Sequence, residues 1–452
     1  MENGFGLLTL VPVLLVIVLA TITRSSFEPL VIGLLSGCLI AYQGDFLDKF
    51  IAHLTTALTD EDSGWVILVC MLYGSLITMM IRSGGTKAFG NYLLRHVKSR
   101  KSALLATWFV GLLISIDDYL HSLAVGTAMK RVTDKFLIPR EMLAYVVHAT
   151  SAPLCILLPF STWSVFISRV LEDNNLAPDG QGLTAYLNLI PYLFFSFTGL
   201  LIVLLVIFGI IPAIGKMKAA TMRAAAGNTI PEGGHTLEDE EDHHPDHEGK
   251  IYYFFLPLVI LICATLWFNN DALKGVMITN FVTFIYFALT RVMSLKQLSA
   301  ALFSGFNTIL FPIILVILAF ALKLVNDDLQ LVQYVIGHVS PFMTRELLPA
   351  VAFFTLALIA FMTGSSWDLY IIAIPIVIPL AQSMDANLWM VVSTVVCAGA
   401  FGSQAGFFSD STILSSASTN CPTMTHAITQ FPYMVITLFA TTAVYLLMGF
   451  LL

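Results

Sequence analysis

The chain consists mainly of long apolar runs separated by short polar connections. Many of the runs reach about twenty residues, the length at which a helix spans the roughly 30 Å hydrocarbon core of a bilayer. The runs lie at 5–23, 28–43, 65–82, 102–130, 141–171, 183–211, 251–268, 272–290, 305–324, 346–383, 387–420 and 431–451. Runs of this length and number predict an all-α polytopic membrane protein.

Two of the runs, 102–130 and 346–383, are interrupted near the middle by polar residues and are long enough for two half-length helices. Basic residues flank the first of them on both sides, and basic residues gather on the cytoplasmic side of a membrane. Both of its ends are therefore placed in the cytoplasm, which makes it a re-entrant hairpin. Completing the topology from charge gives about ten transmembrane helices plus two re-entrant hairpins, with both termini outside. The acidic loops 44–64 and 172–182 then lie outside, and the second hairpin opens from the outer face.

The two halves of the chain resemble each other. Residues 90–119 and 331–370 each hold a short amphipathic stretch with a His-Val pair, then an apolar arm and a polar tip with Asp. The following runs, 141–171 and 387–420, are both interrupted by small and hydroxyl residues. Because an odd number of crossings separates the two units, they are expected to be inverted repeats, the architecture of many secondary transporters.

This repeat predicts three parts, with a first repeat and linking helix at 1–211, a linker at 212–250 and a second repeat at 251–452. The linker holds the run HTLEDEEDHHPDHEGK. A stretch this polar and charged favours a flexible cytoplasmic connection. His243, His244 and His247 could also bind a metal or sense pH, although a solvated linker is the simpler interpretation.

Composition excludes a soluble protein of this size. Hydrophobic residues make up 57% of the 452 residues and charged residues only 11%, whereas about a quarter of an ordinary soluble domain is charged. The net charge of −7 comes largely from the linker and indicates little about partners; no nucleic acid is expected. The six cysteines have no paired spacing, which argues against disulfides and against a zinc site.

Four polar interruptions could carry chemistry. They are Ser115-Ile-Asp117-Asp118-Tyr119 with His121; His148-Ala-Thr150-Ser151 with Ser161-Thr162-Trp163; Thr363-Gly-Ser365-Ser366-Trp367-Asp368; and Gly402-Ser403-Gln404 with Ser409-Asp410-Ser411-Thr412. Carboxylates at membrane depth are costly and usually mark ion or proton pathways. Hydroxyls and unwound carbonyls supply the oxygen ligands that a hard cation such as Na⁺ needs, and half-helix N-termini favour an anionic group.

These rules divide the candidates into three groups. The ion- or proton-binding candidates are Asp117, Asp118, Asp410, Ser161, Thr162, Ser409 and Thr412, with Na⁺ expected at the Asp117–Asp118 pair. The substrate-binding candidates are Thr150, Ser151, Ser365, Ser366, Asp368, Ser403 and Gln404. The candidates for a proton relay are His121 and His148.

Ordinary structural roles compete with these assignments. Asp118 or Asp368 could cap the second arm of its hairpin, and Ser and Thr often bond back to helical carbonyls. The histidines could be hydrogen-bonded packing residues, and Trp163 and Trp367 could line a cavity or wedge the hairpin tips. Two adjacent carboxylates repel each other, which favours exchange of a proton for a cation at one of them.

At these residues the sequence resembles the NhaC-like family of sodium/proton antiporters, within the ion-transporter superfamily of inverted-repeat carriers. The matching segments are IDDYLHSLAVGTAMKRVTDKFLIPREMLAYVVHATSAP, FSTW, MTGSSWDLYIIAIPIVIPLA, GSQAGFFSDSTILSSAS and TQFPYM. The resemblance implies a cation-coupled secondary transporter in a bacterial cytoplasmic (inner) membrane, with Na⁺ and H⁺ as coupling ions and no cofactor. Analogy with the superfamily suggests a homodimer in the lipid bilayer.

One departure from the family pattern leaves the transported solute open. Family members typically carry Asp-His where this chain has Ser403-Gln404. A Na⁺/H⁺ antiporter working by alternating access is the leading hypothesis. The alternative is a Na⁺- or H⁺-coupled transporter of a small organic solute, an amino acid or a carboxylate. An intramembrane enzyme using His121 and Asp117 is disfavoured, because the chain has no metalloprotease or nucleophile-elbow motif.

Overall fold

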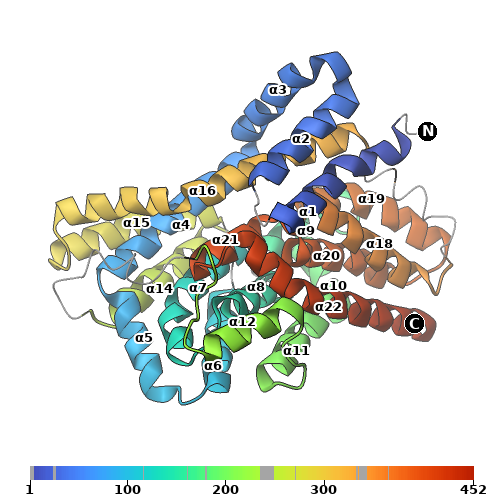
Figure 1. The fold of residues 1–452 in the computed structure, drawn as a ribbon. Coiled ribbons are helices and arrows are strands. Elements are labelled where there is room, and N and C mark those ends of the chain that lie inside the picture. The colour runs from blue at the N-terminus through green and yellow to red at the C-terminus, as the bar shows by residue number, and fades with distance from the viewer. Residues whose placement is uncertain are drawn as a thin grey trace.

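The computed structural model describes residues 5–23, 27–115, 117–159, 161–178, 181–234, 249–269, 271–331, 334, 344–364 and 366–452. Every regular element in these residues is a helix (Figure 1). The α-helices of the first half and the linker are α1 (Val11–Thr23), α2 (Phe27–Tyr42), α3 (Phe46–Thr59), α4 (Glu61–Arg82), α5 (Gly85–His96), α6 (Arg100–Ile114), α7 (Asp118–Lys135), α8 (Arg140–Leu157), α9 (Thr162–Asp173), α10 (Gly182–Leu189), α11 (Phe194–Phe208) and α12 (Gly215–Ala225). Those of the second half are α14 (Tyr252–Trp267), α15 (Ala272–Leu289), α16 (Leu295–Asp328), α18 (Leu348–Thr363), α19 (Trp367–Ser383), α20 (Leu388–Ala405), α21 (Asp410–Thr419) and α22 (Thr423–Leu451).

Several of these helices are suited to lipid rather than water. Within the described ranges, 4 helices are long and apolar enough to cross a membrane, or up to 8 if each bent pair is one span. Large apolar side chains such as Leu113, Phe281 and Phe439 are exposed on them, where acyl chains rather than water would cover them. The chain is therefore an all-helical polytopic membrane protein, as its apolar runs predict. The number of ten crossings remains a prediction.

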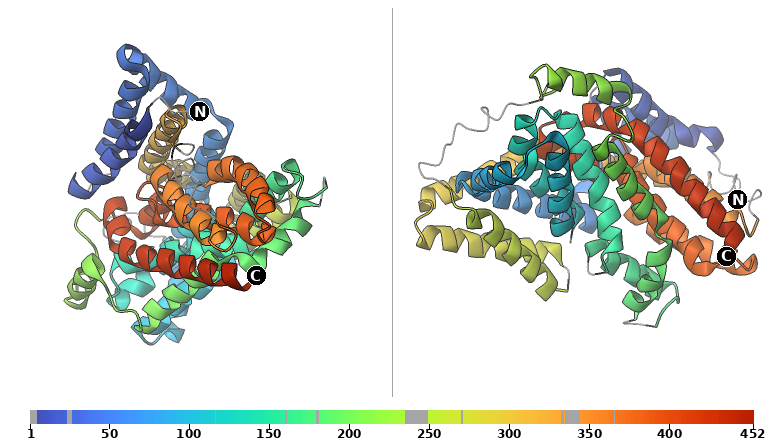
Figure 2. Two further views of the ribbon diagram at one scale, coloured as in Figure 1. Left: turned by 90° about the vertical axis from the view of Figure 1, so that its right-hand side faces the viewer. Right: turned by 90° about the horizontal axis from the view of Figure 1, so that it is seen from below.

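The expected interruptions are present at all four places. The run 102–130 is divided between α6 and α7, and the run 346–383 between α18 and α19. The runs 141–171 and 387–420 are divided in the same way, into α8 with α9 and α20 with α21. Figure 1 shows α7, α8, α20 and α21 near the middle of the molecule, and in the right-hand view of Figure 2 α18 and α19 (orange) lie toward one end, near both termini.

The first broken segment folds back on itself at its tip. Gly111 of α6 lies so close to His121 of α7 that a Cβ on the glycine would be 2.7 Å from the imidazole. Both arms also pack on α8. The second segment is similar, because α18 and α19 both pack on α20, and the hydroxyl of Ser366 donates to the carbonyl of Gly399 at 2.9 Å.

The helices of the two halves also match in position along the chain. Helices α6 and α18 begin at Arg100 and Leu348, and helices α8 and α20 begin at Arg140 and Leu388. The separation in sequence is the same for the two pairs. The break after α8 and the break after α20 have equal lengths, because α9 begins five residues after Leu157 and α21 five residues after Ala405. The order of broken and unbroken helices is therefore repeated. Whether the copies are inverted across the membrane remains a prediction.

One sequence expectation about an irregular segment is wrong. The stretch 44–64, expected to be an outer loop, is mostly helix, because Phe46, Phe50 and Leu54 of α3 recur at helical spacing and pack against the core. The run 183–211, expected to be one span, consists of α10 and α11, a helix pair bent by 49°. Pro191 lies at this bend, in the short 3₁₀ turn Ile190–Tyr192. Proline interrupts the helical hydrogen bonds, which explains why the helix bends here.

The first part of the expected flexible linker is also helical and packed. The helix α12 contacts α8 and α22, and Arg223 on it forms two hydrogen bonds with Glu141 of α8, at 2.9 and 2.8 Å. A buried carboxylate needs such a partner. The charged remainder, including His243, His244 and His247, lies outside the described residues.

Candidate functional site

The site begins at the start of α7, where the first broken segment turns. Asp117 is the N-cap of this helix, and its Oδ1 accepts a hydrogen bond from the amide of Leu120 at 3.0 Å. A carboxylate at a helix N-terminus is stabilised by the unpaired amides there. The capping role expected for Asp118 thus belongs to its neighbour Asp117, which leaves the side chain of Asp118 available for other partners.

Two further helix N-termini are built in the same way. Ser161 caps α9 and donates to the carbonyl of Cys155 at 2.6 Å. Ser409 caps α21 and donates to the carbonyl of Ser403 at 2.5 Å. Each serine thus accepts from its own helix and closes the end of the preceding one, which fixes the angle between the two halves of a broken segment.

The three carboxylates lie close together where these helix ends meet. Asp118 accepts from the indole nitrogen of Trp163 at 2.9 Å and from the hydroxyl of Ser411 at 2.9 Å. Asp117 accepts from the hydroxyl of Thr162 at 3.1 Å. These contacts join α7 to α9 of the same half and to α21 of the other half.

Asp410, the third carboxylate, completes the group from the second half. Its Oδ2 accepts from the hydroxyl of Tyr119 at 2.5 Å, and its Oδ1 accepts from the amide of Ser411 at 2.7 Å. We refer to Asp117, Asp118 and Asp410 as the carboxylate cluster. Their hydrogen-bond partners named here are neutral donors, which orient the oxygens without cancelling the negative charge.

Burial makes this charge costly. The exposed fractions are 0% for Asp117 and 1% for Asp118. Isolated carboxylates are rarely buried in ionised form, because the loss of hydration costs several kcal/mol for each ion (roughly, after relaxation). Several carboxylates in one buried place favour binding of a proton or a cation, and their oxygens are the ligands that a hard cation prefers.

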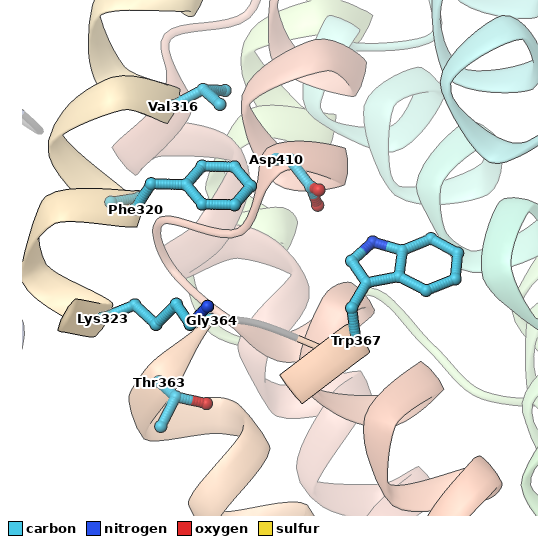
Figure 3. A pocket seen from close by; sticks show the side chains of 8 residues that line it. Val316, Phe320, Lys323, Thr363, Gly364, Trp367 and Asp410 are labelled. Atoms are coloured by element: carbon cyan, nitrogen blue, oxygen red, sulfur yellow. The ribbon is translucent and has the colours of Figure 1, made fainter. Parts of the chain in front are cut away.

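A pocket lies on one side of the cluster and reaches Asp410 (Figure 3). The pocket is partly open, and its empty volume of about 350 Å³ includes space that is continuous with solvent. The lining residues are Val316, Ala319, Phe320, Lys323, Thr363, Gly364, Trp367 and Asp410. Figure 3 shows Lys323 from α16 and Asp410 from α21 projecting into the same space. Gly364 ends α18 with a φ of 68°, a left-handed conformation that glycine adopts without strain.

A line of hydroxyl groups extends from the cluster between α7 and α21. After Ser411, Ser415 donates to Ser122 at 3.1 Å and Ser418 donates to the carbonyl of Ser122 at 2.6 Å. The line ends at Asn420, which accepts from Lys130 at 3.3 Å. Since α21 rises about 1.5 Å per residue, this hydroxyl line leads away from the carboxylates toward a basic end of the molecule.

Several other predicted residues lie apart from the cluster. Thr150 and Ser151 donate to carbonyls of their own helix. Ser366 braces α19 against α20. Ser365 lies outside the described residues, and for Asp368 only its place in α19 is described.

The remaining predicted residues lie nearer the cluster or in a second polar group. Ser403 contacts Ser411 at 2.9 Å between their hydroxyls, and Thr412 donates to the carbonyl of Gly406 at 2.6 Å. The imidazole of His121 contacts the hydroxyls of Ser115 and Thr150, whereas only the backbone amide of His121 contacts Asp117, at its carbonyl. The described side chains therefore do not form the His121–Asp117 pair imagined for an enzyme. Gln404 is fully buried, and its amide has no hydrogen-bond partner within the described part of the chain.

Sequence reasoning missed four residues of this region. Tyr119 had no assigned role, although it adjoins the Asp pair. Lys323 is a charged residue inside a predicted span, which is itself a signal of function. His426 and Gln430 lie four apart on α22 and therefore share a helix face. That spacing could have identified them.

These features place the protein in the class of multi-pass membrane transporters built on broken helices. The Na⁺/H⁺ antiporter family matches residues 181–450. This is more than half of the chain, which therefore belongs to that family. The match includes Asp410 and begins after Asp117 and Asp118.

One relative extends the similarity to nearly the whole chain. An uncharacterized protein of Haemophilus influenzae is 27% identical over 481 residues, which cover 98% of this chain and 91% of the relative. The similarity therefore includes the first half, where two of the three clustered carboxylates lie.

Proposed function

We propose that the protein is a secondary transporter that exchanges Na⁺ for H⁺ by alternating access. The observation that carries this proposal is the carboxylate cluster, in which Asp117 and Asp118 meet Asp410 from the other half. Because the buried charges repel each other, the cluster is most stable with a cation or with protons bound. Competition between the two at one site couples their movements.

The path through the protein is proposed to follow the two polar features beside the cluster. The pocket at Asp410 includes Thr363 and Gly364 at the tip of the second hairpin, which is expected to open outward. The hydroxyl line between α7 and α21 leads toward Lys130 and the expected cytoplasmic side. Alternating access then means that water reaches the cluster from one of these sides at a time.

The remaining expectations form part of the same proposal. The repeats would span 1–211 and 251–452 and be inverted across the bilayer, with 212–250 as the cytoplasmic linker. The transporter would act in a bacterial cytoplasmic membrane and bind monovalent cations without a further cofactor. Superfamily analogy favours a homodimer, and crosslinking in membranes would test it.

Proton movement in proteoliposomes tests the exchange. The purified protein is reconstituted with a pH-sensitive dye inside, and Na⁺, Li⁺ or K⁺ is added outside. Wild-type protein should move protons when Na⁺ is added, and Asp117→Asn should abolish this movement. Asp173→Asn, at an exposed carboxylate at the end of α9, is the matched control. Unchanged proton movement in Asp117→Asn would remove this carboxylate from the mechanism.

A second candidate function is Na⁺- or H⁺-coupled transport of a small organic solute. The lining of the pocket favours it, because charged, hydroxyl and apolar side chains meet there beside the cluster. Lys323 and Asp410 offer opposite charges to a carboxylate and an amino group, and Phe320 and Trp367 offer apolar surface.

Uptake of radiolabelled amino acids and carboxylates, with and without a Na⁺ gradient, distinguishes the two functions. For a solute carrier, Lys323→Met should abolish uptake and Lys216→Met, at an exposed residue of α12, should not. Absence of uptake for every solute tested, with intact Na⁺/H⁺ exchange, would leave the first function alone.

A further inference from the structure

A second buried polar group lies between α8, α20 and α22, apart from the carboxylate cluster. It consists of His148, His426 and Gln430 with the backbone carbonyls of Ser403 and Gln404, and we call it the histidine group. The exposed fraction of all three side chains is 0%. His148 Nδ1 lies 3.0 Å from His426 Nε2 and 3.1 Å from Gln430 Oε1. His148 Nε2 lies 3.2 Å from the carbonyl of Ser403.

The carbonyls around His148 determine where protons can be placed. The Ser403 carbonyl can only accept, so His148 Nε2 must carry a proton. Gln430 donates through Nε2 to the carbonyl of Gln404 at 2.9 Å. This bond assigns the orientation of the amide, because the reverse orientation would bring two oxygens together. Gln430 Oε1 is therefore an acceptor that faces His148 Nδ1.

Neutral His148 leaves Gln430 Oε1 without a donor. With its proton on Nε2, its Nδ1 can accept from His426 Nε2, but it faces the acceptor Gln430 Oε1. If one proton adds to Nδ1, both ring nitrogens donate, one to Ser403 and the other to Gln430 and His426. His426 then accepts through Nε2 and carries its own proton on Nδ1, an atom with no hydrogen-bond partner within the described residues. Full burial opposes the positive charge, while two carbonyl groups and a second imidazole favour it.

We propose that His148 and His426 share one exchangeable proton and form a second proton-binding site of the transporter. The proton comes from hydronium, so one O–H bond breaks, the His148 Nδ1–H bond forms and a water molecule is left. This proposal rests on the proposed H⁺-coupled exchange and names a site for H⁺ other than the carboxylates. His426 is not part of any of the motifs that the sequence singled out.

The histidine group is connected to the carboxylate cluster through one residue. The carbonyl of Ser403 contacts His148 and also accepts from Ser409, the N-cap of α21. The hydroxyl of Ser403 contacts Ser411, which donates to Asp118. Protonation of His148 therefore strengthens its bond to a carbonyl that also accepts from the N-cap of the helix that carries Asp410.

The other titratable groups around α8 do not touch His148. On the helices packed against α8 they include His121 of α7, Cys397 of α20, Asp410 of α21, Arg223 of α12 and Tyr433 of α22. The charged residues of α6 lie at its beginning, those of α9 lie toward its end, and α11 has no titratable side chain. His426 is thus the titratable partner in direct contact with the ring.

Nuclear magnetic resonance of ¹⁵N-histidine-labelled protein in lipid nanodiscs tests the proposal without any transport measurement. Nitrogen shifts distinguish a neutral ring from one with two protons, and the variants His148→Gln and His426→Gln assign the signals. We expect His148 to gain a second proton between about pH 8 and pH 4, because full burial opposes the positive charge. A neutral His148 with one tautomer throughout this range would overturn the proposal.

Variants at Gln430 test the link with exchange. Gln430→Leu removes an acceptor and should shift the pH profile of Na⁺/H⁺ exchange about one unit toward acid. Gln430→Glu adds negative charge and should shift it toward alkaline pH. His96→Gln, at the end of α5, is the control. Profiles that coincide with wild type for both variants would contradict the proposal. If His148 titrates but the wild-type protein does not exchange Na⁺ for H⁺, only the proposed function is contradicted.

Discussion

Asp118 is held by two neutral donors from different parts of the fold. Trp163 approaches it from α9 and Ser411 from α21, both at 2.9 Å. Such bonds to an ionised carboxylate are stronger than bonds between neutral groups, and they favour the charged form that a cation binds. The Asp pair could be identified from the sequence, because carboxylates in an apolar run are conspicuous. The role of Trp163 could not be identified from the sequence. A tryptophan that lines a cavity and one that donates to a carboxylate can stand in the same local sequence.

At this scale, the variant Trp163→Phe should weaken Na⁺ binding without removing the ring. Loss of one charge-assisted hydrogen bond favours the protonated carboxyl, so the Na⁺ concentration for half-maximal exchange should rise roughly tenfold. The active pH range should move toward alkaline values. Exchange assays over a range of Na⁺ concentrations measure both. Trp267→Phe, at a residue that is 83% exposed, is the control, and equal Na⁺ dependence of the two variants would show that the indole bond is unimportant.

The broken helices place the chemistry, and serine caps determine where they break. Ser161 and Ser409 occupy equivalent positions and make equivalent bonds, each to the carbonyl six residues earlier. The sequence predicted the four breaks from their polar residues. It did not predict helix α3 or α12, because charged residues in these segments suggested loops while their apolar residues recur at helical spacing.

Each cap should contribute measurably to stability. Ser409→Ala and Ser161→Ala remove a cap and a buried hydroxyl bond, and each should lower the free energy of unfolding by about 1 kcal/mol. Thermal unfolding in detergent measures the loss, with Ser383→Ala as the control at an exposed helix end. A melting temperature unchanged by both cap variants would show that the breaks are held by packing alone.

At the scale of the whole molecule, the two halves cross most closely between α4 and α16. Figure 1 shows these helices running past each other along one side of the molecule. Gly74 and Gly305 meet at the crossing, where a Cβ on Gly305 would lie 2.5 Å from the carbonyl oxygen of Gly74. The order of helices in the two halves could be predicted from the repeated breaks. The crossing of α4 and α16 could not be predicted, because nothing in the sequence of either helix indicates the helix that it contacts.

Gly305→Ala should therefore disturb the crossing. The added methyl group meets backbone, which cannot move aside as a side chain can, and the free energy of unfolding should fall by about 1–3 kcal/mol. Gly64→Ala, with nothing within 4 Å of the added atom, is the matched control. Equal melting temperatures for the two variants would show that α4 and α16 are more loosely packed than described.

Binding of radioactive Na⁺ to the purified protein over a range of pH tests the central claim, which is competition between Na⁺ and H⁺ at the carboxylate cluster. If each Na⁺ displaces one proton, affinity should fall roughly tenfold for each pH unit on the acid side. Asp118→Asn should abolish the binding and Asp173→Asn should retain it. Na⁺ binding that is independent of pH, or that persists in Asp118→Asn, would contradict the account.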